Sequence, residues 1–204
     1  MRRCNLKLIQ PKFDGDISLE RTIKNRRTCR SFTSKSLTLV QFSQLLWAAY
    51  GITDDRGFMR SVPSGGALYP MDIYALIGNR GVDDIQEGLY HYEPRAHSLT
   101  QKLGGDLRKE LARASLSQMW MAEAPLNLVI SAEYGRICGK YGQRGIRYAL
   151  MEAGHIAQNI FLQAEALRLG AGIVGAFDDE RVTGILTLVK NHDPLLIMPV
   201  GYTG

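Results

Sequence analysis

Cysteine is scarce in this sequence, and no pair of cysteines has the spacing of a metal or disulfide motif. The 204 residues include three cysteines, Cys4, Cys29 and Cys138. An odd number without a CxxC pair argues against a disulfide framework and a zinc knuckle, so we expect reduced, structural thiols. The four histidines fall on different predicted elements without paired ligand spacing or an HExxH motif. We therefore expect no metal site.

Long hydrophobic runs are also missing. No stretch approaches the roughly 18 to 20 consecutive apolar residues of a membrane span. The opening residues, MRRCNLKLIQPKFDGD, lack the apolar region of an export signal. Because 45% of the residues are hydrophobic and 22% are charged, the composition is typical of a globular protein. We expect a cytoplasmic protein with an N-terminal arm, residues 1–17, and one domain, residues 18–204.

Positive charge is in excess, but it is confined to one segment. The net charge is +5, yet six basic residues and no acidic one lie between Arg21 and Lys35, and the rest of the chain is close to neutral. Such a local cluster suits a small multivalent anion such as a phosphate group better than the extended backbone of a nucleic acid. The alternative is a solvated basic surface. We expect no nucleic acid partner.

The hydrophobic pattern predicts an alternation of helices and strands with antiparallel pairing in the middle of the chain. Thr38 and Gln41 have the form of a capping box, and Gly51 ends the helix that follows. A pattern from about Gln143 to Leu169 predicts a helix of about 40 Å. The other predicted helices cover about 18–27, 105–114 and 178–188, and the predicted strands cover 71–78, 88–92, 97–103, 126–132, 173–174 and 195–200.

Two glycine-rich loops stand out, and neither fits a common catalytic motif. Residues 170–175, GAGIVG, match the GxGxxG pattern, but a helix precedes them where a dinucleotide-binding fold requires a strand. Ser64 lies in PSGG, which is not the GxSxG of a serine nucleophile. A basic cluster and glycine loops without an evident acid, base or nucleophile suit a protein whose bound cofactor carries the chemistry.

Five blocks, in order along residues 19–202, resemble the nitroreductase family. They are RRTCRSF (26–32), PSGGALYP (63–70), EAGHIAQN (152–159), GIVGAFDD (172–179) and PVGY (199–202). Within the family, the chain is similar to the branch that includes SagB-type dehydrogenases and azoline oxidases. The resemblance implies an α+β, nitroreductase-like fold. Its central sheet would be mixed but mostly antiparallel and flanked by helices, with a long central helix and an intertwined homodimer.

The resemblance also implies that flavin mononucleotide (FMN) binds at the dimer interface. The phosphate and ribityl positions would be Arg26, Thr28 and Arg30, with Arg27 beside them; a surface role is the alternative for Arg27. The partner subunit would line the isoalloxazine with Pro63, Ser64, Gly65, Gly66 and Ala67, and the first subunit would face it with Val174, Gly175 and Ala176.

The activity implied is that of an FMN-dependent oxidoreductase. By a ping-pong mechanism, NAD(P)H would deliver a hydride that leaves to a nitroaromatic or quinone acceptor. Lys140 and Tyr141 match a pair that azoline-oxidising members place near the flavin, where a proton acceptor would assist removal of a ring proton. The alternative for this pair is a lysine at a helix start and a packing tyrosine. Two further readings stay open, a SagB-type dehydrogenase that oxidises peptide azolines or another organic donor, and a flavin-binding protein without turnover.

Overall fold

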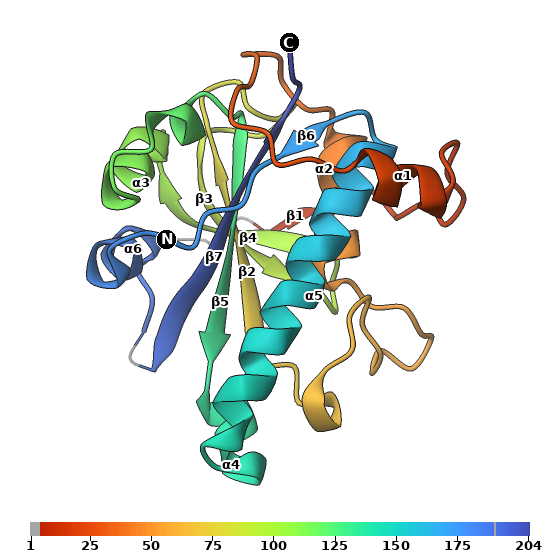
Figure 1. Cartoon of the computed structure of the whole chain (residues 1–204), viewed down its shortest axis with the longest axis vertical. Helices are drawn as coiled ribbons and strands as arrows, with labels where there is room; N and C mark the ends of the chain where they lie inside the picture. The colour runs from red at the N-terminus through yellow and green to blue at the C-terminus, as the bar shows by residue number, and fades with distance from the viewer. Residues whose placement is uncertain (1–4, 190) are drawn as a thin grey trace.

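The computed structural model describes residues 5–189 and 191–204. Its elements are, in chain order, β1 (Asn5–Lys7), α1 (Leu19–Asn25), α2 (Leu39–Tyr50), η1 (Gly65–Ala67), β2 (Met71–Ile77), β3 (Gly88–Glu93), β4 (Ser98–Gly104), α3 (Arg108–Ala114), η2 (Met119–Ala122), β5 (Leu126–Glu133), α4 (Gly135–Tyr141), α5 (Arg144–Ala166), β6 (Gly170–Ala171), α6 (Asp179–Leu186) and β7 (His192–Gly201). Figure 1 shows α5 crossing the sheet along most of the length of the molecule.

One seven-stranded sheet organises the molecule, in the order β1-β4-β3-β2-β5-β7-β6. Every pair of neighbouring strands is antiparallel. The α+β class is confirmed, but the prediction of a mixed sheet is corrected. In the described residues, parallel pairing is limited to two isolated bridges, Thr28–Ala171 and Leu37–Val82. Short connections such as the one between β3 and β4 join antiparallel neighbours directly, without the long crossover that a parallel pair needs.

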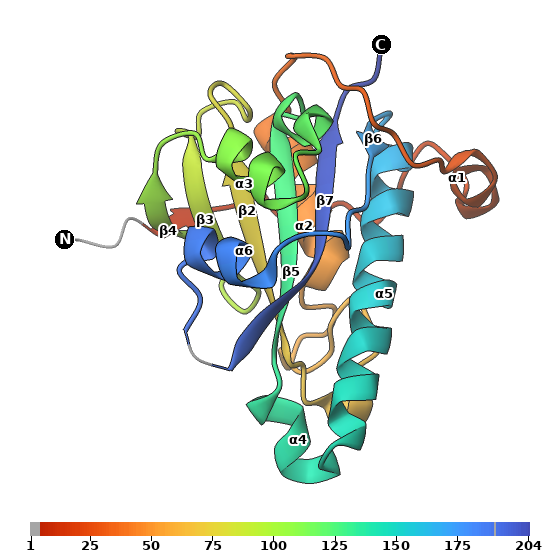
Figure 2. The same ribbon diagram turned by 60° about the vertical axis from the view of Figure 1, so that its left-hand side comes forward.

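Helices cover both faces of the sheet. Figure 2 shows α5 on one side and α3 and α6 on the other. Along β5, Leu126, Leu128 and Ile130 belong to the core under α2 and α5, whereas Val129 packs in the core under α3 and α6. This double burial explains the nearly continuous apolar run LNLVISA, from which the sequence predicts a central strand.

Local capping signals define the starts of α1, α2 and α6, as predicted. The capping box of Thr38 and Gln41 is present, and Gly51 caps the end of α2. Ser18 accepts a hydrogen bond from the Arg21 N–H at the start of α1, and Asp178 accepts one from the Arg181 N–H at α6. The long helix α5 is shorter than predicted, because its 23 residues correspond to about 35 Å.

The N-terminal arm is docked on the domain. β1 pairs with β4 and forms one edge of the sheet. The Ile9 N–H donates to Ser43 Oγ at 3.0 Å and the Lys12 N–H donates to Gln44 Oε1 at 2.9 Å, so α2 holds the segment after β1. The first four residues of the predicted arm lie outside the described residues, and Cys4 is among them. Cys29 and Cys138 are free thiols.

Two strand boundaries differ from the prediction. The short strand expected at 173–174 lies instead at Gly170–Ala171, and Val174 makes a single bridge to Ile197. The last strand begins at His192 and extends to Gly201, beyond the predicted 195–200 at both ends. Among the helices of the described chain, none combines the length and apolar character needed to cross a bilayer.

Candidate functional site

The basic segment Arg26–Arg30 lies alongside the turn that follows α5. Thr28 bridges Ala171 in β6, and the Cys29 N–H donates to the Ala171 carbonyl at 2.9 Å. The Thr33 N–H then donates to the Tyr202 carbonyl at 2.8 Å, just beyond β7. The structure therefore makes neighbours of two predicted cofactor segments that are about 140 positions apart in the chain.

Two glycines permit this close approach. A Cβ on Gly172 would lie 2.8 Å from the Cys29 carbonyl oxygen and 2.9 Å from the Trp120 ring. A Cβ on Gly170 would lie 2.9 Å from Cys29 Sγ and would also collide with the Thr203 methyl group. Since real Cβ atoms do not approach other atoms so closely, a side chain at either position would push the basic segment away from β6.

The three arginines of this segment have different surroundings. Arg26 is partly buried, with its guanidinium carbon 5.1 Å from the centre of the Phe161 ring. Arg27 is exposed, and its Nη1 donates to the Lys24 and Arg26 carbonyls. Arg30 is exposed. Within residues 5–189 and 191–204 no carboxylate pairs with any of the three, so their charge is available to an anion.

The Val174–Ala176 turn presents backbone to solvent. Val174 and Ile197 exchange both backbone hydrogen bonds, at 2.8 and 2.9 Å, which fixes the turn on β7. Gly175 and Ala176 are exposed, and in the part of the chain that the structure describes no acceptor pairs with their N–H groups. Gln118 Nε2 donates to the Ala176 carbonyl at 3.3 Å. Two N–H donors on a fixed turn can therefore bind a polar ligand atom.

The second predicted cofactor segment, Pro63–Ala67, forms a strained turn beside the Lys140–Tyr141 pair. Gly66 and Ala67 have φ of 63° and 53°, which is uncommon for a residue with a side chain such as Ala67. A Cβ on Gly66 would lie 2.6 Å from the Tyr141 hydroxyl oxygen and 3.1 Å from Lys140 Nζ. The predicted catalytic pair and the predicted cofactor turn thus meet within one chain.

The basic segment and the Pro63–Ala67 turn do not meet within this chain. Gly65 packs against Tyr148 near the start of α5, whereas Arg26 lies over Phe161 near its end. Tyr148 and Phe161 are 13 residues apart on this helix, which corresponds to about 20 Å. Figure 1 shows α1 beside one end of α5 and the loop after α2 beside the other.

Sequence reasoning missed a buried carboxylate under the Pro63–Ala67 turn. Glu152 is 1% exposed, and it accepts hydrogen bonds from Ser64 Oγ at 2.5 Å and from the Tyr50 hydroxyl at 2.7 Å. Burial holds the pKa of Glu152 above its usual value, although these hydrogen bonds and the charge of Arg60 act in the opposite direction. The signal available in the sequence was an acidic residue on the apolar face of a long helix.

A second polar cluster brings together acidic and histidine side chains, possible metal ligands that lie far apart in the sequence. Asp72, Glu133 and His192 each bring one possible metal-binding atom within 4.8 Å of the others. Arg136 already occupies both carboxylates, since its Nη2 lies 2.9 Å from Asp72 Oδ2 and its Nε lies 2.5 Å from Glu133 Oε2. We interpret the cluster as an ion-pair network that joins β2, β5, β7 and α4.

His91 completes this network on its other side. Its Nε2 lies 3.1 Å from Asp72 Oδ1 and its Nδ1 lies 2.8 Å from Glu93 Oε1. Burial lowers the pKa of His91, but the two carboxylates outweigh it and the pKa is raised. Burial likewise opposes ionisation of Asp72, yet hydrogen bonds from His91 and Arg136 hold its pKa below the usual value.

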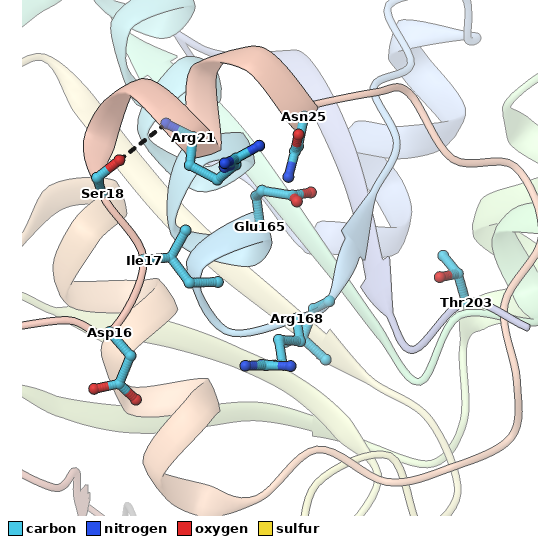
Figure 3. Close-up of a pocket in the computed structure, with 9 residues that line it drawn as sticks. Asp16, Ile17, Ser18, Arg21, Asn25, Glu165, Arg168 and Thr203 are labelled. Atoms are coloured by element: carbon cyan, nitrogen blue, oxygen red, sulfur yellow. Dashed lines mark hydrogen bonds between the residues drawn. The ribbon is translucent and has the colours of Figure 1, made fainter.

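An open pocket of about 560 Å³ lies next to the basic segment. Figure 3 shows Arg21 and Arg168 in it together with Glu165, between the start of α1 and the end of α5. Its wall continues to Asn25, directly before Arg26, and to Thr203. Both charge signs are represented, so the pocket alone does not select an anion, but it leaves room beside the segment predicted to hold the phosphate.

Comparison with known proteins identifies the class to which this fold and site belong. The sequence model of the nitroreductase family matches residues 23–202. A Methanocaldococcus jannaschii protein named "Putative nitroreductase MJ1384" is 47% identical over 186 residues, covering 91% of each chain. A crystal structure from Ralstonia eutropha with a similar description has a TM-score of 0.85 at 28% identity, covering 98% of this chain and 90% of that one. The chain therefore belongs to the nitroreductase family.

A more distant relative points to one branch of the family. The Microcin B17-processing protein McbC of Escherichia coli is 28% identical over 180 residues. The match covers 81% of this chain and 62% of McbC. The predicted resemblance to the family and to this branch is confirmed at the level of sequence.

Proposed function

We propose that this chain is an FMN-dependent oxidoreductase that works as a homodimer, with each flavin between two protomers. The observation that carries the proposal is the division of the site. The basic segment lies toward one end of α5, and the Pro63–Ala67 turn with Lys140 and Tyr141 lies toward the other. A second protomer brings the missing half to each site. Membership of the nitroreductase family supports this arrangement.

The residues of the first half fit the chemistry of FMN. Two guanidiniums and the Thr28 hydroxyl suit a phosphate dianion, because charge-assisted hydrogen bonds are the strong ones. The exposed N–H groups of Gly175 and Ala176 are donors for the polar edge of a flavin ring, and Gly172 lets the backbone segments lie close. When bound, FMN supplies the hydride chemistry, and the chain supplies binding, orientation and exclusion of water.

The experiment that tests this proposal is the visible spectrum of the purified protein before and after anaerobic NADH and NADPH. Flavin bands near about 370 and about 450 nm that bleach with one nucleotide support an NAD(P)H oxidoreductase and identify its donor. Turnover with nitroaromatics and quinones then defines the acceptor. A colourless protein that does not take up FMN contradicts the proposal, and a yellow protein that no reductant bleaches favours a flavin-binding protein without turnover.

A second candidate is oxidation of a peptide azoline, favoured by the position of Lys140 and Tyr141. The Lys140 Nζ and the Tyr141 hydroxyl both lie against Gly66 of the cofactor turn, where a basic group can accept a proton from substrate. The distant similarity to a microcin-processing protein supports it. With a thiazoline peptide, Lys140→Ala is expected to lower turnover by about a hundredfold or more. Absence of azoline oxidation by the flavin-loaded wild type contradicts this candidate.

A further inference from the structure

The middle of α5 carries a carboxylate that the proposed function does not use. Glu152 is 1% exposed and lies on the helix face that packs into the core. An ionised carboxylate in such a place is costly unless hydrogen bonds replace its hydration. Its two oxygens receive those hydrogen bonds from different parts of the chain, Oε1 from Tyr50 at the end of α2 and Oε2 from Ser64.

Both hydroxyls are oriented by backbone groups behind them. Ser64 Oγ accepts the Tyr69 N–H at 2.9 Å, and the Tyr50 hydroxyl accepts the Met71 N–H at 3.2 Å. Because each hydroxyl accepts from a backbone N–H, its single proton is directed at Glu152. Two chains of hydrogen bonds therefore converge on one carboxylate, an arrangement that suits its ionised form.

The surrounding charges act on the same group. The guanidinium carbon of Arg60 lies 4.1 Å from the centre of the Tyr50 ring and 4.6 Å from that of Tyr69, and its charge favours the Glu152 carboxylate. His155, one turn further along α5, acts in the same direction. Arginine, two tyrosines and the carboxylate together enclose one end of the turn at residues 64–69.

The turn held in this way is the strained one. Gly66, Ala67 and Tyr69 have φ of 63°, 53° and 49°. A non-glycine residue holds this conformation only where its surroundings impose it. We propose that Glu152 is a positioning residue, which fixes the Pro63–Pro70 turn through Ser64 and Tyr50 in the shape that receives the flavin and the substrate. This inference rests on the proposed function, since the ligand of the turn is the flavin proposed above.

The test compares Glu152→Gln with Glu110→Gln, the same change at an exposed glutamate of α3 on the opposite face of the sheet. A glutamine can accept from one hydroxyl, but its amide nitrogen has no acceptor to offer the other. We expect backbone amide exchange in peptides covering residues 63–70 to accelerate about tenfold in Glu152→Gln and to stay at the wild-type rate in Glu110→Gln. FMN affinity should fall by a similar factor in the first variant alone.

Ser64 provides a second pair of variants if Glu152→Gln does not fold. Ser64→Ala removes the hydroxyl and should loosen the turn. Ser64→Thr keeps a hydroxyl and should retain both exchange protection and FMN affinity, which would show that the hydrogen bond holds the turn. Unchanged exchange at 63–70 in both Glu152→Gln and Ser64→Ala overturns the inference. If the wild type binds no FMN but the two variants still have a loosened turn, the proposed function is contradicted and the positioning role is supported.

Discussion

Arg26 and Arg30, both proposed to hold the FMN phosphate, have different surroundings. Arg26 is partly buried over Phe161, so its charge has a fixed place, whereas Arg30 is exposed and adaptable. Thr28 lies between them, with its backbone fastened to β6. At this scale the sequence was informative, because the concentration of basic residues without acidic ones is visible without a structure.

The double substitution Arg26→Ala with Arg30→Ala is expected to weaken FMN binding. Each lost charge-assisted hydrogen bond to the phosphate should cost on the order of 1.5 to 3 kcal/mol of binding free energy. Titration of the apoprotein with FMN measures the loss. Arg113→Ala, an exposed arginine on α3, is the control and should leave the affinity unchanged. Unaltered flavin affinity in the double variant would contradict the phosphate assignment.

His97 should make stability depend on pH. Its Nε2 donates to the Ile9 carbonyl at 2.8 Å, so its Nδ1 accepts from the Tyr92 hydroxyl at 2.8 Å and the ring is neutral. Burial lowers the pKa of His97 below 6.5, so the unfolded chain binds a proton more readily. The free energy of unfolding should therefore fall as the pH drops below about 6.5.

Denaturant unfolding at about pH 7.5 and about pH 5.5 measures this effect of His97. Wild type should lose more stability on acidification than His97→Asn, which has no ring to protonate and tolerates the φ of 42° at this position. His91 titrates with the opposite sign, because its pKa is raised, but it is present in both proteins and cancels in the comparison. Equal losses in the two proteins would show that His97 does not titrate on unfolding.

At the scale of elements, the junction between the basic segment and β6 depends on glycines, which have no side chain. The segment at 28–29 lies so close to Gly170 and Gly172 that no Cβ fits at either glycine. The strand predicted at 173–174 lies earlier for a related reason. Gly170 pairs with Gly201, so the first pair of this two-residue strand consists of residues without side chains. Periodicity of side chains does not reveal such a strand.

Gly172→Ala should therefore destabilise the fold, by about 1 to 3 kcal/mol, because the new methyl group meets the Cys29 carbonyl and the Trp120 ring. Gly175→Ala in the same turn is the matched control. The nearest atom to its Cβ would be Leu196 Cδ2 at 3.8 Å, so its unfolding free energy should change by less than about 0.5 kcal/mol. Chemical denaturation of both variants decides the matter, and equal stabilities would refute the close-packing argument.

At the scale of the whole molecule, the outer face of α5 carries a small apolar patch among its polar residues. Leu150 and Met151 are 52% and 55% exposed, and Gly154, one turn further, is also exposed. Exposed apolar groups beside a small residue suit close packing against another protein surface. The proposed dimer requires such a contact between protomers.

We predict that light scattering gives a mass of about twice the 22.7 kDa of the chain. Leu150→Glu should shift the protein toward the monomer by placing a charge in the interface, and it should lower FMN affinity at the same time. Leu116→Glu is the control, because Leu116 is even more exposed, at 70%, and follows α3 on the opposite face of the sheet. A monomeric wild type that binds FMN would rule out the two-protomer site.

The sequence by itself determined the local features of this protein. The capping box of α2, the caps of α1 and α6, the double burial of β5 and the long helix all follow from residues a few positions apart, because backbone geometry and burial of one face act over that range. The five family blocks likewise identified the family and the segments predicted to bind the cofactor.

Only the tertiary structure decided which distant residues meet. It brought Glu152 to hydroxyls 88 and 102 positions away, joined Asp72 to Arg136 across 64 positions, and paired all neighbouring strands antiparallel. It also separated the two halves of the site along α5. These contacts depend on how whole layers pack, and periodicity within one element contains no information about its partners.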